Sequence, residues 1–232
     1  MNAMILAAGR GERMRPLTDA LPKALLIAGG KPLIVWHIEK LAAAGFSRIV
    51  INHAHLGALI EEALGNGKRF GVEIVYSPET EALETAGGIA RALQLLGEAP
   101  FAVVNADVYS DFDYRRLADA TRSLLPRDRL AHLVLVANPE HHPSGDFALR
   151  EDRVIPDGAA YTFSGMAAYS PAMFGGIAPG AKVKLATLLR PQIAMQRVGG
   201  ELYAGRWRDV GTPARLASLE RELALAPAVR GV

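Results

Sequence analysis

The chain has 232 residues, of which 50% are hydrophobic and 22% are charged, a composition typical of a globular protein with a substantial core. Its 26 basic and 24 acidic residues leave a formal net charge of +2, which argues against a dedicated nucleic-acid-binding protein, because such proteins carry a basic surface. The absence of cysteine excludes disulfides, thiolate metal sites and cysteine nucleophiles.

Apolar runs in the sequence are all shorter than the roughly 20 residues needed to cross a bilayer. The first of them stops at Gly9 and Arg10, so the N-terminus does not resemble a secretory leader. We therefore expect a cytoplasmic protein with neither a membrane nor a nucleic acid as partner, and no obligate protein partner is evident.

The first half of the chain alternates between apolar runs and amphipathic segments. The apolar runs predict buried strands over residues 3–8, 48–52, 72–76 and 101–105. Apolar residues spaced by three and four predict helices over 32–44 and 56–64, and a third helix that follows residues 83–88 and carries Ile89, Leu93 and Leu96. Such alternation is typical of parallel βαβ units. Residues 1 to about 110 are therefore predicted to form a nucleotide-binding half.

The second half has a different pattern. It predicts helices over about 113–125 and 213–225, strands over 131–137, 162–169, 201–204 and 207–210, and a hairpin of 146–150 with 153–155. Residues 185–195 are helical in pattern, but Pro191 is expected to break or kink this helix at Arg190.

These elements predict one continuous domain over residues 1–232. We expect an α/β fold of Rossmann-like type, with a mixed, mostly parallel sheet flanked by helices. The residues from about 111 to 232 are expected to add a small acceptor-binding lobe and a C-terminal helix.

The segment after the first predicted strand is rich in glycine and cations. Gly9 and Gly11 allow a sharp turn whose backbone N–H groups can face an anion, and Arg13, Arg15 and Lys23 follow closely. This combination predicts a phosphate cradle, and an ordinary glycine turn with scattered surface cations is the alternative. The pattern fits neither a P-loop, which ends in Gly-Lys-Ser/Thr, nor a dinucleotide fingerprint, which needs a third glycine.

Asp107 stands just beyond the predicted strand over 101–105. Open α/β sheets bind ligands beyond the carboxyl ends of their strands, so Asp107 is a candidate for chemistry. A turn or helix-cap aspartate is the alternative.

The first loop resembles the signature loop of the sugar-1-phosphate nucleotidyltransferases. Residues 6–23 read LAAGRGERMRPLTDALPK, and Ala24 stands where that family more often has proline. The resemblance implies a fold of the nucleotidyltransferase type in which this loop wraps the triphosphate of a nucleotide. The residues that it implies for binding the phosphates are Ala8, Gly9, Gly11, Glu12, Arg13 and Lys23.

The same resemblance implies catalytic roles for Arg13, Lys23 and Asp107. Arg13 would neutralise the departing pyrophosphate, and Lys23 would lie near the α-phosphate. Residues 207–212, WRDVGT, resemble the family's W-x-D-x-G-T segment, which makes Asp209 a predicted partner of Asp107 on one Mg²⁺. Carboxylates, phosphate oxygens and water are the ligands that Mg²⁺ prefers.

Further segments resemble the family's base and sugar sites. Residues 83–89, LETAGGI, imply that Gly87 and Gly88 pack against the base, while capping of a helix by Thr85 is the alternative. The residues implied for the sugar are Asn105, Gly145, Asp146, Ser164 and Gly165, of which Asn105 could equally be a turn former. We assign no role to His53, His55, His141, His142 or Lys184, and a solvated surface position is favoured for Lys184.

Within the family, Asn52-His53-Ala54 and Gly145-Asp146-Phe147 resemble the branch that uses UTP and N-acetylmuramate 1-phosphate. The resemblance implies a Mg²⁺-dependent transfer of UMP that gives UDP-N-acetylmuramate and pyrophosphate, a reaction of cell-wall recycling. The alternatives are a nucleotidyltransferase for another hexose 1-phosphate and a non-catalytic nucleotide-sugar sensor.

Overall fold

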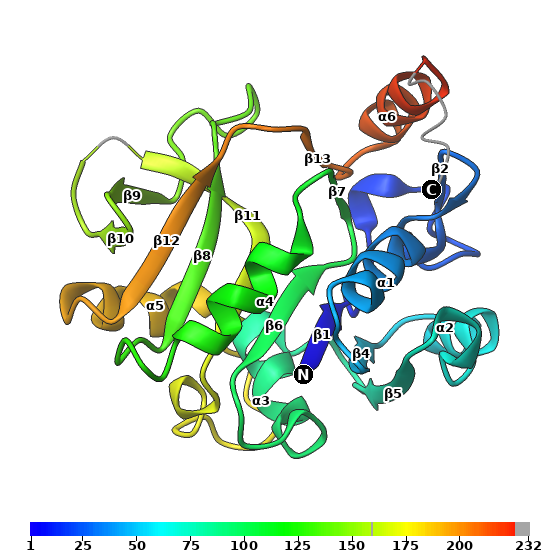
Figure 1. Ribbon diagram of the computed structural model, residues 1–232. Coiled ribbons are helices and arrows are strands. Elements are labelled where there is room, and N and C mark those ends of the chain that lie inside the picture. The colour runs from blue at the N-terminus through cyan, green and yellow to red at the C-terminus, as the bar shows by residue number, and fades with distance from the viewer. Residues whose placement is uncertain (159, 226–232) are drawn as a thin grey trace.

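A nine-stranded sheet runs through both halves of the computed structural model, which describes residues 1–158 and 160–225 (Figure 1). The strand order is β5-β4-β1-β6-β11-β8-β12-β10-β9. The strands of this sheet are β1 (Asn2–Leu6), β4 (Arg48–His53), β5 (Glu73–Pro78), β6 (Phe101–Asn105), β8 (Ala131–Val136), β9 (Phe147–Arg150), β10 (Arg153–Ile155), β11 (Ala160–Tyr169) and β12 (Val198–Tyr203).

Two small strand pairs and the helices complete the described fold. The short strands are β2 (Ile27–Ala28), which pairs with β3 (Lys31–Pro32), and β7 (Val108–Ser110), which pairs with β13 (Trp207–Asp209). The α-helices are α1 (Leu33–Ala43), α2 (Gly57–Leu64), α3 (Glu84–Leu96), α4 (Tyr114–Ser123), α5 (Leu185–Ala194) and α6 (Pro213–Leu225). The 3₁₀ helices are η1 (Glu12–Met14), η2 (Lys23–Leu25), η3 (Lys68–Phe70) and η4 (Pro171–Met173).

The sheet is mixed, as predicted. Strands β5, β4, β1 and β6 are parallel to their neighbours in that order, which matches the βαβ pattern of the first half. In the second half β8 and β12 are parallel, whereas β11 pairs antiparallel with β6, β8 and β9. Parallel pairing thus dominates in the first half of the chain, and antiparallel pairing dominates in the second half.

Helices cover both faces of the sheet because alternate residues of the strands point to opposite sides. In β1, Ala3 and Ile5 join a buried cluster with residues of α1 and α4. Met4 joins the opposite cluster, which contains apolar residues of α3 and α5. All three side chains are fully buried, so β1 is a central strand with a helix layer on each face.

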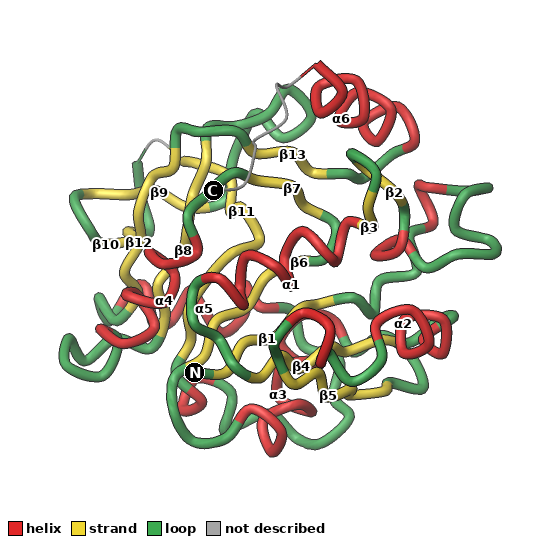
Figure 2. Tube along the Cα trace, turned by 45° about the vertical axis from the view of Figure 1, so that its right-hand side comes forward, coloured by secondary structure: helices red, strands yellow, loops and turns green. Residues whose placement is uncertain are grey.

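A third buried cluster joins the first loop to the last helix. It contains Met14 of η1, Leu33 of α1, Val210 just after β13, and Leu219 of α6. Each of these side chains is 0% exposed. Figure 2 shows α6 next to the β7–β13 pair. The two segments that the sequence marks as chemically important, 6–23 and 207–212, are therefore held against each other by apolar packing.

Two predicted elements of the second half, the helix over 185–195 and the strand over 201–204, differ from the structure. Helix α5 continues through Pro191 to Ala194, because its buried face of Leu185, Leu189 and Ile193 holds it in place while Pro191 is exposed. Strand β12 begins at residue 198 rather than 201, because its first paired residues include two glycines, which weaken a strand signal.

Helix α3 begins at Glu84, so Gly87 and Gly88 lie inside it rather than before it. Thr85 is also inside α3 and does not cap the helix, since the N-cap position is that of Leu83. No helix among the described residues is long and apolar enough to cross a membrane.

Candidate active site

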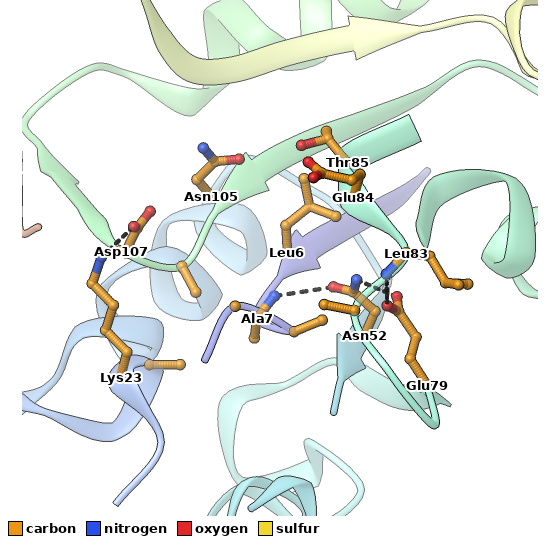
Figure 3. Close-up of a pocket in the computed structure, with 15 residues that line it drawn as sticks. Leu6, Ala7, Lys23, Asn52, Glu79, Leu83, Glu84, Thr85, Asn105 and Asp107 are labelled. Carbon is orange, nitrogen blue, oxygen red and sulfur yellow. Dashed lines mark hydrogen bonds and ion pairs between the residues drawn. The ribbon is translucent and has the colours of Figure 1, made fainter. Parts of the chain in front are cut away.

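The candidate site lies where three parallel strands end. In the register of the sheet, Leu6 of β1 is opposite both Asn52 of β4 and Asn105 of β6. The chain leaves the sheet at these positions, and the backbone and side chains beyond them face a shared space. A cavity of about 330 Å³ occupies this edge (Figure 3).

Loops and strand ends from the first half of the chain line this cavity. Figure 3 shows the Lys23–Asp107 pair at one end and Asn52 with Glu79 at the other. The lining residues are Leu6, Ala7, Ala8, Gly9, Lys23, Ala24, Asn52, Glu79, Ala82, Leu83, Glu84, Thr85, Asn105, Ala106 and Asp107. Its volume of about 330 Å³ lies at the lower end of the range for small-molecule sites.

Asn52 and Glu79 form a buried polar network at one end of the cavity. Asn52 Nδ2 donates to Glu79 Oε1 at 2.7 Å, and its Oδ1 accepts from Ala7 N–H at 3.0 Å. Glu79 Oε2 accepts from Leu83 N–H at 2.9 Å. Glu79 is 6% exposed, and its carboxylate is satisfied by these two donors. The network therefore fixes the first loop to the start of α3.

The first loop turns at Gly11 in a conformation that favours glycine. Its φ is +70°, and a Cβ at this position would meet Thr18 Cγ2 at 3.0 Å and Lys23 Cβ at 3.3 Å. Thr18 Oγ1 donates to the carbonyl of Gly11 at 2.8 Å, which closes the loop. A side chain at residue 11 would thus press on Lys23, the cation that reaches the cavity.

Lys23 and Asp107 meet at the other end of the cavity. Lys23 Nζ donates to Asp107 Oδ2 at 2.5 Å, and the exposed fractions of their side chains are 11% and 36%. The pair joins η2 to the end of β6 across 84 residues of sequence. Two of the three predicted catalytic groups, Lys23 and Asp107, therefore lie together at one position of the first cavity.

Asp209 lies beside Asp107 because β13 pairs with β7. Asp209 is opposite Val108 in that pair, and Val210 N–H donates to the carbonyl of Asp107 at 2.9 Å. The two predicted metal ligands thus come from neighbouring backbone segments, as expected for a shared cation.

A second cavity, of about 370 Å³, adjoins the first. Asn105 and Asp107 line both cavities. The second cavity is lined by Arg13, Asn105, Asp107, Val108, His141, His142, Thr162, Phe163, Ser164, Gly165, Trp207 and Asp209. Three of the residues predicted to bind the sugar, Asn105, Ser164 and Gly165, therefore lie in its wall.

Side chains from two other segments contact Asp209, namely Arg215 of α6 and His141 from the segment between β8 and β9. Arg215 Nη1 of α6 donates to Asp209 Oδ2 at 2.5 Å. His141 Nε2 lies 3.1 Å from the same oxygen and 3.1 Å from Arg215 Nη1. One carboxylate oxygen thereby ties α6 to the segment between β8 and β9.

The donor set at Asp107 and Asp209 fits Mg²⁺ only as part of a larger shell. Among residues 1–158 and 160–225, no group of three or more His, Asp or Glu side chains is placed to hold a metal ion. Asp107 at the wall shared by the two cavities and Asp209 in the second cavity leave the remaining positions for phosphate oxygens and water, which is the environment that Mg²⁺ prefers.

A buried histidine supports the strand that follows Asp107. His37 Nε2 lies 2.7 Å from the carbonyl of Val108, which can only accept, so Nε2 carries the proton. Nδ1 then accepts from the hydroxyl of Tyr114 at 2.6 Å. Burial lowers the pKa of His37 to about 4, although the bond to Val108 opposes the change. His37 is therefore neutral and anchors β7 near neutral pH.

The structure gives the two predicted base-binding glycines a different environment. Neither lines the first cavity, and both are buried in α3. A Cβ on Gly87 would lie 2.3 Å from the carbonyl oxygen of Ala181, and one on Gly88 would lie 2.8 Å from Glu79 Oε1. Their small size thus allows close protein packing, and contact of the base with them stays a prediction.

Other predicted residues lie around the cavities rather than in them. Arg13 lines the second cavity and not the first, and neither Gly11 nor Glu12 lines either cavity. Gly145 and Asp146 are absent from both linings, but Asp146 Oδ2 accepts from Phe163 N–H at 2.8 Å and so supports the wall.

Sequence reasoning missed Asn52 and Glu79 as site residues. Asn52 is the last residue of the strand predicted over 48–52, and Glu79 follows the one predicted over 72–76, so the strand-end rule that selected Asp107 could have selected them too. It also missed Arg215, whose contact with Asp209 has no signal in the sequence. His53 binds Glu61 away from the cavities, and His55 and Lys184 are exposed.

Two adjoining cavities with shared side chains can hold two reactants next to each other. The chain belongs to the nucleotidyl transferase family, whose model matches residues 2–147. This result confirms the family predicted from the loop, and the class of enzyme is a nucleotidyltransferase.

Similar proteins cover nearly the whole chain. An N-acetylmuramate alpha-1-phosphate uridylyltransferase from Neisseria meningitidis is 56% identical over 93% of this chain and 95% of the relative. A Caulobacter vibrioides protein of the same name is 33% identical over 97% of both chains. A mannose-1-phosphate guanylyltransferase from Mycobacterium tuberculosis is 30% identical over 100% of this chain and 68% of the relative.

A solved structure confirms the fold. It is assigned to a glucose-1-phosphate thymidylyltransferase from Bacillus anthracis, in complex with sucrose. It superposes with a TM-score of 0.85 over 98% of this chain and 97% of that chain, at 21% sequence identity.

Proposed function

We propose that this protein transfers UMP from UTP to N-acetyl-α-muramate 1-phosphate, with Mg²⁺ as cofactor, and releases pyrophosphate and UDP-N-acetylmuramate. The observation that carries the substrate assignment is the 56% identity, over almost the full length of both chains, to the Neisseria meningitidis uridylyltransferase. We place this activity in one catalytic unit made of both halves of the chain, in the cytoplasm.

The two cavities support a direct transfer between bound substrates. The nucleoside would occupy the first cavity, and the sugar would occupy the second. Asn105 and Asp107 belong to both, so the acceptor phosphate and the α-phosphorus would meet at that wall. An oxygen of the acceptor phosphate attacks the α-phosphorus, and the bond to the β-phosphate breaks.

Charge neutralisation is the main chemical task of the side chains at this wall. Lys23 would contact the α-phosphate, and its bond to Asp107 fixes the position of its ammonium group. Arg13, which lines the neighbouring cavity, is assigned to the departing pyrophosphate. Asp107 and Asp209 would hold Mg²⁺, which supplies positive charge to the phosphate oxygens. No general base is needed, because the acceptor is already an anion.

A second candidate is guanylyl transfer to mannose 1-phosphate. The Mycobacterium tuberculosis relative favours it, since the whole chain aligns with that protein. Backbone contacts in the first cavity leave little trace of base preference in residue identity.

Pyrophosphate release across a matrix of nucleoside triphosphates and sugar 1-phosphates tests the proposal. The expected result is turnover with UTP and N-acetylmuramate 1-phosphate that exceeds all other pairs. Good turnover with GTP and mannose 1-phosphate alone would replace the substrate assignment and keep the class. Absence of turnover with every pair, together with nucleotide-sugar binding that survives Asp107→Ala, would instead identify a sensor.

A further inference from the structure

Arg215 is held at Asp209 through one of its three side-chain nitrogens. Arg215 Nη1 donates to Asp209 Oδ2 at 2.5 Å and lies 3.1 Å from His141 Nε2. Within the part of the chain that the structure describes, neither Nε nor Nη2 of Arg215 has a hydrogen-bond partner. A guanidinium group has five N–H donors, and this side chain is 26% exposed. Most of the donors of Arg215 are therefore unused in the free protein.

Arg13 lies beside Arg215 at Gly211. A Cβ on Gly211 would lie 3.0 Å from Arg215 Nη1, 3.0 Å from Asp209 Oδ1 and 3.3 Å from Arg13 Nη2. The missing side chain thus leaves the space in which two guanidinium groups and one carboxylate meet. Arg13 is exposed, and no ion pair among residues 1–158 and 160–225 includes it. We call Arg13, Asp209 and Arg215 the Gly211 cluster.

The Gly211 cluster carries more positive than negative charge. Arginine side chains stay protonated in proteins, so the single carboxylate of Asp209 balances only one of the two guanidinium groups. Asp107, which lies nearby, is already paired with Lys23. Arg13 and Asp209 line the second cavity, from which a ligand can reach the cluster. The cluster therefore favours the binding of an anion from this cavity.

A divalent cation at Asp209 would deprive Arg215 of its partner. The carboxylate of Asp209 is a proposed ligand of Mg²⁺, and a cation bound there would compete with Arg215 for Oδ2 and repel its guanidinium group. Arg215 would then need another acceptor. Phosphate oxygens would supply one, because they complete the shell of the metal and match the planar fork of a guanidinium group.

We propose that Arg215 binds a substrate phosphate group together with Arg13, and that it does so once a divalent cation has replaced it at Asp209. Two cations thus use the same carboxylate in turn, and binding of the metal and of the phosphate strengthen each other. The inference rests on the proposed function for the presence of these phosphates, but not for the identity of the base or the sugar. The phosphate belongs either to the departing pyrophosphate or to the acceptor.

The test measures the binding of two probes, inorganic pyrophosphate and N-acetylmuramate 1-phosphate, to the full-length protein by isothermal titration calorimetry. Each probe is titrated into wild type and Arg215→Met, with EDTA or with saturating Mg²⁺. In Mg²⁺ the variant should bind one probe about tenfold to a hundredfold more weakly, the range for one hydrogen bond to a charged group. In EDTA the two proteins should differ by less than about twofold.

The ratio of the two affinities isolates Arg215, because complexes of Mg²⁺ with the probe in solution are the same for both proteins. A loss for pyrophosphate assigns Arg215 to the leaving group, and a loss for the sugar phosphate assigns it to the acceptor. Arg221→Met removes an exposed arginine of the same helix and should alter binding in neither condition.

Asp209→Asn tests the exchange without any metal. This substitution removes the charge that holds Arg215, so Arg215 is free to bind phosphate in EDTA. Adding Arg215→Met to Asp209→Asn should then weaken binding of the same probe by about tenfold in EDTA, against less than about twofold in the wild-type background. Arg215→Lys, which keeps the charge but loses the planar fork, should retain part of the affinity in Mg²⁺.

The possible outcomes distinguish this inference from the proposed function. Equal affinities of wild type and Arg215→Met for both probes in Mg²⁺ would overturn the role of Arg215. Equal losses in Mg²⁺ and in EDTA would overturn the exchange at Asp209. Turnover of UTP with N-acetylmuramate 1-phosphate by wild type would support the proposed function in both cases. Turnover of a different sugar phosphate alone would overturn the proposed substrate, and a tenfold loss of pyrophosphate binding in Arg215→Met would still support the inference.

Discussion

Lys23 Nζ lies 2.5 Å from Asp107 Oδ2, a contact that joins the glycine loop to the end of the central strand β6. The contact holds an ammonium group and a carboxylate at the wall that the two cavities share. Charged groups that are fixed before the substrate arrives can stabilise charge that develops during phosphoryl transfer.

Lys23→Met should lower kcat by about a hundredfold, the usual cost of one lost charge contact to a phosphoryl transition state. KM for the sugar phosphate should change less, since the lost contact is to the nucleotide. Initial rates of pyrophosphate release give both constants. Lys68→Met, at an exposed lysine of η3, is the matched control and should behave as wild type. A Lys23→Met enzyme with full kcat would remove Lys23 from the catalytic groups.

Arg215→Met should strengthen the binding of a divalent cation. In the free protein Arg215 Nη1 occupies Asp209 Oδ2, so it competes with a metal for that oxygen. This pair is partly exposed, and surface ion pairs contribute about 0.2 to 1 kcal/mol, which predicts that the dissociation constant for Mn²⁺ falls by up to about fivefold. Mn²⁺ titration followed by electron paramagnetic resonance measures this without turnover.

Two control variants show what weaker and unchanged Mn²⁺ binding look like in this measurement. Asp209→Asn should weaken Mn²⁺ binding, because it removes a charged ligand. Arg221→Met removes an exposed arginine of the same helix and should leave binding unchanged. Weaker binding in Arg215→Met would mean that Arg215 orients Asp209 for the metal instead of competing for it.

Local patterns were enough to predict most of the fold and the position of Asp107 at the edge of the sheet. The apolar runs located β1, β4 and β6, and the strand-end rule placed Asp107 correctly at the edge of the sheet. The glycine loop and the WRDVGT segment pointed to the family, which the family model confirms.

Contacts between distant residues were not predictable from such patterns. His141 and Asp209 are 68 residues apart, and nothing in either local sequence indicates that they meet. The pair of Asn52 and Glu79 forms because β4 and β5 are neighbours in the sheet, which is a property of topology. Gly87 and Gly88 were misplaced relative to α3, because close packing and ligand contact leave the same residue type in a sequence.

Glu84→Gly should stabilise the fold. Glu84 has a φ of +61° at the start of α3, a conformation that costs a non-glycine residue about 1 to 2 kcal/mol. Glycine removes this strain but loses more entropy on folding, so the free energy of unfolding should rise by about 0.5 to 1 kcal/mol. Chemical denaturation measures the difference.

Glu84→Ala separates strain from side-chain function. Alanine keeps the strained backbone and removes the carboxylate, which lines the first cavity (Figure 3). The alanine variant should therefore show no gain in stability. Both Glu84→Gly and Glu84→Ala remove the carboxylate, so any change in KM for UTP should be the same in the two variants. An equal gain in stability for alanine would rule out strain as the cause.

Gly165→Ala should disturb the wall between the cavities. Gly165 has a φ of +79°, and a Cβ there would lie 2.7 Å from Asn105 Nδ2. We expect a loss of about 1 to 3 kcal/mol in the free energy of unfolding and a higher KM for the acceptor, because Asn105 must move. Gly176→Ala places its Cβ in open space and should alter neither quantity. An unchanged acceptor KM in Gly165→Ala would argue against contact between Asn105 and the sugar.

Acidification should destabilise the protein through His37. Burial lowers the pKa of His37 from 6.5 to about 4, so between these values the unfolded chain binds a proton that the folded chain does not. The contribution of neutral His37 to the free energy of unfolding is therefore complete above about pH 6.5. This free energy falls as the pH drops toward about 4, by about 3 kcal/mol in total. His37→Asn should be less stable at pH 7 and should lose less on acidification, whereas His55→Gln should keep the wild-type slope. Urea denaturation across this pH range measures the slopes, and equal slopes for His37→Asn and wild type would show that other groups cause the acid sensitivity.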